Sequence, residues 1–147
     1  MGYETDSYTL MAAGTVCAAG LTTAPAGNQF AGSDFVRGVI RVAITAQTGT
    51  WTSTGVVAVM LQNSPDGGTT WYPNAAALGA AGYPATITPL GYSQLFTTGT
   101  TPVVGLYSVI VNTFPGNLFR AAVNVVAGTN VTLGITADLQ KLVPDNS

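Results

Sequence analysis

The sequence is very poor in charged side chains, and this shortage limits how its surface can be built. Four basic and six acidic residues make up 7% of the 147 positions, whereas ordinary soluble domains carry about 25% charged residues. A monomeric domain needs a hydrated, charged surface to stay apart from its neighbours. We therefore predict that this chain covers much of its surface with protein, and that it assembles.

The composition also predicts one folded domain. Disordered chains lack apolar residues, but here 47% of the residues are hydrophobic. A chain of this length usually forms one domain that buries most of its surface. We expect an extended N-terminal arm over residues 1–10, a folded domain over 11–140 and a flexible polar tail over 141–147.

Segments rich in Val, Ile, Thr and Tyr alternate with Gly, Pro and Asn, which is typical of strands separated by turns. About seven or eight such strands in one small domain predict an all-β fold, either an antiparallel β-sandwich or a jelly-roll-like barrel. The expected strands cover residues 8–19, 35–45, 56–62, 92–97, 103–112, 118–126 and 130–139, with a short one near 86–88.

Three segments carry specific expectations. In residues 35–45 the side chains alternate, so Arg37 and Arg41 share one face of the strand. Residues 56–62 are apolar enough for a central strand that is buried on both faces. Gly128-Thr129-Asn130 is interpreted as the turn of a hairpin that joins the last two strands.

The sharpest local motif runs from Ser64 to Trp71 and fits the Asp-box template, in which Ser, Asp, Gly and Trp recur at fixed spacing. Ser64 and Asp66 are expected to accept hydrogen bonds from backbone amides, while Gly67 and Gly68 permit positive φ and Trp71 covers the turn. Sialidases and related propellers carry several copies away from catalysis. We interpret this single copy as a structural turn.

A carbohydrate-binding β-sandwich module is an alternative function. Its stacking platforms would be the aromatic rings of Trp51, Trp71, Tyr72, Tyr83 and Tyr92. Aromatic residues in strands more often belong to a core or an interface, so glycan binding is the less favoured interpretation.

The chemistry of catalysis is missing from the sequence. The chain has no histidine, so it cannot build a Ser-His-Asp or Cys-His arrangement, and the commonest transition-metal ligand is absent. The acidic residues are scattered singly, without a glycosidase pair or a calcium loop. We expect no enzymatic activity, no catalytic residue, no cofactor and no metal site.

Several partners and environments are also disfavoured. The net charge is −2 and no Lys/Arg cluster occurs, so nucleic acid is not an expected partner. No apolar stretch approaches the roughly 20 residues of a spanning helix, and residues 1–6 lack the basic start of a signal peptide. Cys17 is the only cysteine, so no internal disulfide can form, and we expect it to be a buried small hydrophobe.

Two stretches, residues 56–72 and 116–139, together resemble a pattern found in small structural proteins of tailed bacteriophages. In those proteins, a strand leads into a turn with Gln, Ser, Asp, Gly and Trp, and an aromatic-Arg pair opens a strand near the C-terminus. Here these elements are residues 62–71 and the pair Phe119-Arg120.

The resemblance implies a capsid decoration, or cement, protein. Such proteins are β-rich, commonly form homotrimers and bind the outer surface of the major capsid protein shell, which they stabilise without chemistry. The implied location is the exterior of the virion, after synthesis in the host cytoplasm. A tail or head-fibre subunit is the alternative within the same class.

The segments expected to reach a capsid are the arm at residues 3–10 and a long loop at residues 74–91, because termini and long loops are free to reach a partner. The arginines have two interpretations: they cap a sheet surface or pair with Asp34 or Asp138, or they contact an acidic capsid surface. The candidate contact residues are Tyr3, Tyr8, Arg37, Arg41, Tyr83 and Arg120.

Overall fold

The computed structural model describes residues 2–51, 56–71, 96–97, 104–111, 114 and 118–143. Over these residues the chain is all-β and antiparallel, which confirms the predicted fold class. The elements in chain order are β1 (Gly2–Thr23), η1 (Ala26–Asn28), β2 (Phe30–Ala31), η2 (Gly32–Asp34), β3 (Arg37–Thr48), β4 (Val56–Ser64), β5 (Phe96–Thr97), β6 (Gly105–Val111) and β7 (Leu118–Val143).

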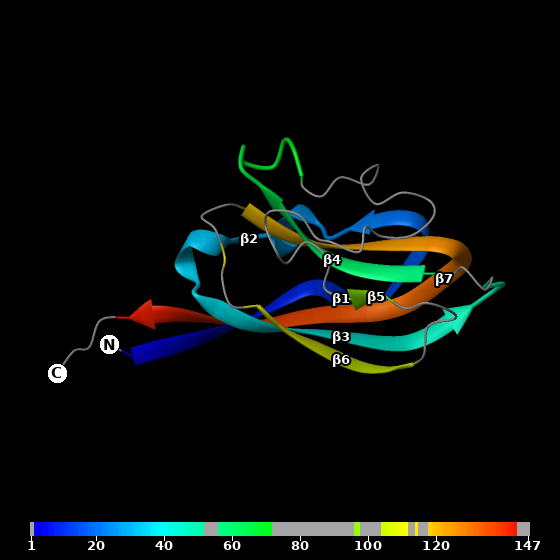
Figure 1. The fold of residues 1–147 in the computed structure, drawn as a ribbon, viewed down its shortest axis with the longest axis horizontal. Coiled ribbons are helices and arrows are strands. Elements are labelled where there is room, and N and C mark those ends of the chain that lie inside the picture. Colours follow the sequence, from blue (N-terminus) through cyan, green and yellow to red (C-terminus); the bar gives the residue numbers. More distant parts are fainter. Residues whose placement is uncertain are drawn as a thin grey trace.

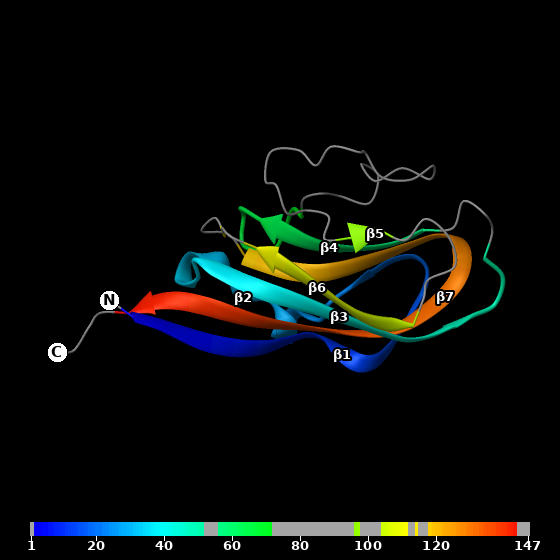
Figure 2. The same ribbon diagram turned by 60° about the horizontal axis from the view of Figure 1, so that its bottom comes forward.

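The long strand β7 organises the sheet. Its first half pairs with β4 and its second half pairs with β3, while β1 runs along its other side. The strand order is β5-β4-β7-β3-β6, with β1 and β2 also paired to β7. Because β7 curves strongly near its middle, this single sheet folds over into two layers, as in a sandwich (Figures 1 and 2).

The hairpin predicted at residues 128–130 is wrong, because β7 continues through this segment without a turn. The small residue there serves packing instead. A Cβ atom on Gly128 would overlap the ring of Trp51, so the indole lies directly against the backbone of β7. Thr50 N also donates a 2.9 Å hydrogen bond to Oγ1 of Thr129. The chain after β3 therefore docks on the curve of β7.

The predicted N-terminal arm does not stand apart from the domain. Residues 2–10 are the first part of β1, where Gly2 pairs with Val143 and Glu4 with Lys141. The predicted tail is likewise in the sheet up to Val143, and residues 144–147 lie outside the described residues. Lys141 Nζ lies 3.3 Å from an Asp6 carboxylate oxygen. The polar ends of the chain thus pair with each other across the sheet.

Strand β1 is irregular in its middle. Its register with β7 shifts between Met11 and Thr15, and Gly14 has a φ of 85°. Gly134 of β7 lies opposite this bulge, where a Cβ atom would come within 2.8 Å of the Ala13 Cα. The bulge therefore lets the two backbones approach closely.

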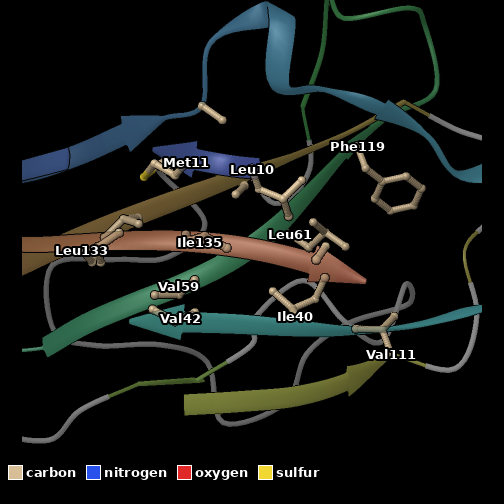
Figure 3. Close-up of a cluster of buried hydrophobic side chains, with 14 of the residues drawn as sticks. Leu10, Met11, Ile40, Val42, Val59, Leu61, Val111, Phe119, Leu133 and Ile135 are labelled. Carbon is tan, nitrogen blue, oxygen red and sulfur yellow. The ribbon is translucent and has the colours of Figure 1, made fainter. Parts of the chain in front are cut away.

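Figure 3 shows the core between the two layers, with side chains from β1, β3, β4 and β7 meeting at its centre. The alternation predicted for β3 is confirmed, since Gly38, Ile40, Val42 and Ile44 are all buried. Each residue from Val57 to Leu61 has no exposed surface, which confirms that β4 is buried on both faces. An aromatic group closes one end of the core and comprises Tyr8, Phe30, Phe35, Phe114 and Phe119.

Several sequence predictions fall on residues that the structure does not describe. These are the loop at 74–91, the strand near 86–88 and most of the strand at 92–97. Within the described ranges, no helix has the length and apolar character needed to cross a bilayer.

Candidate functional site

One face of the sheet is turned away from the core. Along β3, the side chains of Arg37, Val39, Arg41 and Ala43 alternate with buried ones and point outward. The strand register places residues of β6, β7 and β1 beside them. We name this surface the outer face and define it by Tyr3, Thr5, Ser7, Thr9, Arg37, Val39, Arg41, Ala43, Leu106, Ser108, Ile110, Thr136, Asp138 and Gln140.

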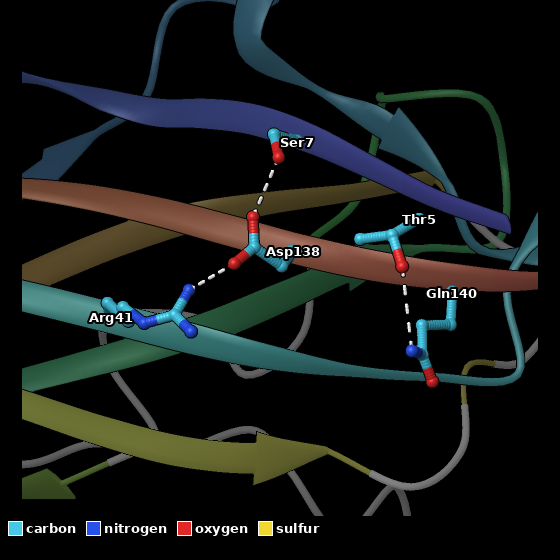
Figure 4. A network of polar contacts seen from close by, with 5 residues as sticks. All are labelled: Thr5, Ser7, Arg41, Asp138 and Gln140. Carbon is cyan, nitrogen blue, oxygen red and sulfur yellow. Dashed lines mark hydrogen bonds and ion pairs between the residues drawn. The ribbon is translucent and has the colours of Figure 1, made fainter.

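A polar network crosses the middle of the outer face. Arg41 forms an ion pair with Asp138, and Ser7 Oγ donates a 2.7 Å hydrogen bond to the other oxygen of that carboxylate (Figure 4). The Ser7 hydrogen bond, followed by that of Arg41, lowers the pKa of Asp138 below its usual value. Three strands, β1, β7 and β3, are therefore joined through one carboxylate.

A second set of contacts lies next to this network. Arg37 Nε donates a hydrogen bond to Oε1 of Gln140, and the Gln140 amide lies 3.5 Å from Oγ1 of Thr5. The Arg37 guanidinium also lies over the Tyr3 ring, 4.7 Å from its centroid. These contacts hold the long Arg37 side chain flat against the outer face, although it remains exposed.

A shallow depression of about 560 Å³ opens on the outer face, and both arginines line it. Val39 and Ile110 provide its apolar wall, whereas Asp138 and Gln140 provide polar groups. Apolar surface beside fixed hydrogen-bonding groups is the usual composition of a protein contact.

The apolar character increases toward β6. Leu106 and Ile110 are 67% and 70% exposed, and Val104 just before the strand is 58% exposed. Single exposed apolar residues are ordinary, but neighbouring ones on one face commonly mark an interaction site. The outer face therefore combines a fixed polar centre with an apolar margin.

The Asp-box-like turn follows β4 on a different part of the molecule. Ser64 Oγ donates to Asp66 at 2.7 Å and accepts from Gly68 N at 2.8 Å, while Thr70 N donates to the same Asp66 oxygen. The Thr70 amide, followed by the Ser64 hydroxyl, lowers the pKa of Asp66 from 3.8 to about 2. Trp71 Nε1 closes the turn by donating to the Gly68 carbonyl at 3.1 Å.

The two glycines of this turn allow backbone conformations with positive φ. Gly67 and Gly68 have φ values of 77° and 106°, which side chains rarely tolerate. All five motif residues are thus engaged in the turn itself, and their side-chain hydrogen bonds stay within residues 64–71.

The tryptophans are engaged within the chain. Arg120 covers Trp71, and Trp51 packs on Gly128 while its Nε1 donates to the Thr48 carbonyl at 3.3 Å. Each ring therefore uses one face inside the protein. The tyrosines proposed as further sugar platforms, Tyr72, Tyr83 and Tyr92, lie outside the described residues.

The structure separates the six candidate contact residues. Tyr3, Arg37 and Arg41 come together on the outer face, and of the two acids weighed as arginine partners, Asp138 pairs with Arg41. Tyr8 instead packs against the core beside Phe35. The other two are Arg120, which lies at the Asp-box-like turn, and Tyr83, which is outside the described residues.

Sequence periodicity did not identify Leu106 and Ile110 as surface residues. Both faces of β6 are apolar, as in a buried strand, and Leu106 and Ile110 are exposed because they lie on the face of the sheet that is turned away from the core. The two-residue period of β6 puts Leu106 and Ile110 on the face opposite Gly105 and Tyr107, but it does not tell which of the two faces is exposed.

Reactive and metal-binding groups are sparse in the described part of the chain. No group of three or more His, Cys, Asp or Glu residues there could hold a metal ion. Cys17 is fully buried, as predicted, and burial raises the pKa of its thiol.

Comparisons with known proteins give little. No protein-family model matches the chain, and no curated protein matches it. Among solved structures, one described by the words "Bacillus endospore appendages form a novel family of disulfide-linked pili" is similar at 10% identity and a TM-score of 0.34. The match covers 97% of this chain and 88% of that chain.

Proposed function

We propose that this chain is a non-enzymatic structural protein that decorates a phage capsid and cements it by laying its outer face on the major capsid protein shell. The observation that carries the proposal is the outer face itself, where exposed apolar side chains flank a fixed polar network. The resemblance of residues 56–72 and 116–139 to small tailed-phage proteins directs the proposal to a capsid.

The apolar margin would supply the affinity. Covering a large aliphatic side chain contributes about 1.5–3 kcal/mol, and Leu106 and Ile110 are each more than half exposed. Part of this gain is lost to the entropy of association. Contacts of a few side chains are individually weak, but a repeating shell offers the same contact many times.

The polar centre would supply orientation. Arg37 is held by Gln140 and Tyr3, and Arg41 is held by Asp138, so these side chains lose little rotamer freedom on binding. A fixed guanidinium at the edge of a depression suits an acidic or carbonyl group of a shell subunit. This arrangement sets the register between the two proteins.

Cementing needs no reaction. A protein that binds the assembled shell, and not its dissociated subunits, stabilises the shell by mass action. Where one copy or oligomer touches two shell subunits, the second contact is intramolecular and strengthens the first.

The test uses purified expanded capsids of the encoding virus and the recombinant full chain. Co-sedimentation followed by mass spectrometry counts bound copies against the major capsid protein. Arg37→Glu reverses a charge on the outer face, whereas Thr69→Glu adds a negative charge at the exposed Asp-box-like turn and is the control for a new glutamate away from that face. Circular dichroism is used to check that both variants are folded.

We expect the native protein and Thr69→Glu to fill symmetric sites on the shell, and Arg37→Glu to bind about tenfold more weakly. If Arg37→Glu filled the sites as fully as the native protein, the outer face would not be the surface that contacts the shell. Absence of the native protein from shells, or a few copies at the tail, would overturn the cement function.

A further inference from the structure

The sheet has two long edge strands. Among the described residues, β6 pairs only with β3, and β1 pairs only with β7. An edge strand presents unpaired backbone groups that can accept another strand, and proteins usually protect such edges with charges, bulges or proline.

The β1 edge is protected. It carries Glu4 and Asp6, and its register with β7 shifts at three places. Gly14 and Gly20 both have positive φ, which interrupts the extended backbone. These features oppose the pairing of β1 with another strand.

The β6 edge has none of these features. Its seven residues include no charged residue and no proline, and all seven pair with β3 without a register shift. Leu106 and Ile110 project from it with about two-thirds of their surface exposed. Among the described residues, β1 thus carries features that oppose strand pairing, and the sequence of β6 carries none of them.

We infer that β6 pairs antiparallel with β6 of a second copy of this chain, extending the sheet across a two-fold axis. The strand is self-complementary when Ser108 lies on the axis. Leu106 of each copy then faces Ile110 of the other, and the two Ser108 side chains face each other. Aliphatic pairs directly opposite one another stabilise antiparallel strands.

Charge favours a second copy as the occupant. The strand offers no charged group that would select a different protein, and the nearest cation on the outer face, Arg41, is neutralised by Asp138. With a net charge of −2, two copies repel each other weakly. A two-fold axis through Ser108 brings no like charges together on β6.

This inference does not depend on the capsid proposal, because it concerns the isolated protein. A two-fold edge contact produces pairs, whereas a ring of three needs two different surfaces on each copy. It therefore differs from the homotrimer that the sequence resemblance implies.

The test combines cross-linking with sedimentation. Ser108→Cys places two thiols on the proposed axis, at a separation that a disulfide can bridge. Thr9→Cys is the matched control, since Thr9 is also exposed on the outer face but lies on β1. The native Cys17 is fully buried and does not compete.

We expect Ser108→Cys to give a covalent dimer under mild oxidation, and Thr9→Cys to stay mostly monomeric on a non-reducing gel. In sedimentation equilibrium, the native chain should show a concentration-dependent dimer. Ser108→Lys and Ser108→Glu should each weaken it about fivefold. Mixing these two variants should restore it.

Three results would overturn the inference. They are a monomer at all concentrations, a trimer, or a dimer that is unaffected by the charges at Ser108. Thermal unfolding of every variant, with Thr9→Lys and Thr9→Glu as controls, distinguishes loss of pairing from loss of folding.

Discussion

Arg120 lies over the ring of Trp71, with its guanidinium carbon 4.1 Å from the ring centroid. The same side chain donates a 2.8 Å hydrogen bond from Nε to Gln62, its cross-strand partner on β4. One arginine thus fastens the Asp-box-like turn to the two strands beneath it.

Replacing this arginine should loosen the turn. Arg120→Ala removes a cation–π contact and a charged hydrogen bond, so we expect a loss of about 1–2 kcal/mol in unfolding free energy. Arg120→Lys keeps the charge but not the fixed Nε donor, and should lose less. Urea unfolding measures both, and an unchanged midpoint for Arg120→Ala would contradict the role.

The turn should also respond to acid. The folded-state pKa of Asp66 is lowered from 3.8 to about 2, so the ionised carboxylate stabilises the fold. This contribution is fully present above about pH 4 and is lost as the pH falls toward 2. Asp66→Asn should therefore show a flatter decline of melting temperature between pH 4 and 2 than the native chain. Identical pH profiles would contradict the prediction.

The aromatic end of the core should be costly to disturb. Phe119 is fully buried and stacks on Phe30 with 5.5 Å between ring centroids. We expect Phe119→Ala to destabilise the fold by about 3–5 kcal/mol. Leu106→Ala removes a side chain that is mostly exposed and should cost little in the monomer. Denaturant titration at low protein concentration compares the unfolding free energies of the two variants. Equal losses would show that Phe119 does not lie in the core.

A single methyl group should be harmful at Gly134. It would lie 2.8 Å from the Ala13 Cα, which is backbone and cannot turn aside. We expect Gly134→Ala to lower stability by about 1–3 kcal/mol. Gly27→Ala is the control, because nothing lies within 4 Å of a Cβ there. Comparable melting temperatures for the two variants would contradict the close approach of β1 and β7.

Cys17 should be slow to react in the folded protein. Its side chain is fully buried and its thiol pKa is raised, so little thiolate is exposed to a reagent. We expect labelling by a thiol-specific dye to be slow in buffer and complete in denaturant. Rapid labelling in buffer would show that the β1 region opens readily.

Local patterns were sufficient for some strands. The alternation in β3 predicted the shared face of Arg37 and Arg41, and the apolar run in β4 predicted burial on both sides. In each case the relevant information lies within one segment, because side-chain direction follows from the two-residue period of a strand.

Long-range contacts decided the rest. The sequence pattern predicts a turn at Gly128. In the structure, a glycine is needed there because the Trp51 ring, far away in the sequence, packs against its backbone. The partners of the outer-face arginines, Asp138 and Gln140, are set by the register between β3 and β7. No local pattern encodes that register, so the site could not be assembled from periodicity.

The pairing of β1 with β7 has a consequence for folding. Ser7 and Asp138, which share a hydrogen bond, are separated by 131 positions in the chain. During synthesis, β1 leaves the ribosome long before its partner exists, and contacts this distant in sequence form slowly. Completion of the fold must therefore wait for β7, and until then the largely apolar strands β4 and β6 are exposed to aggregation.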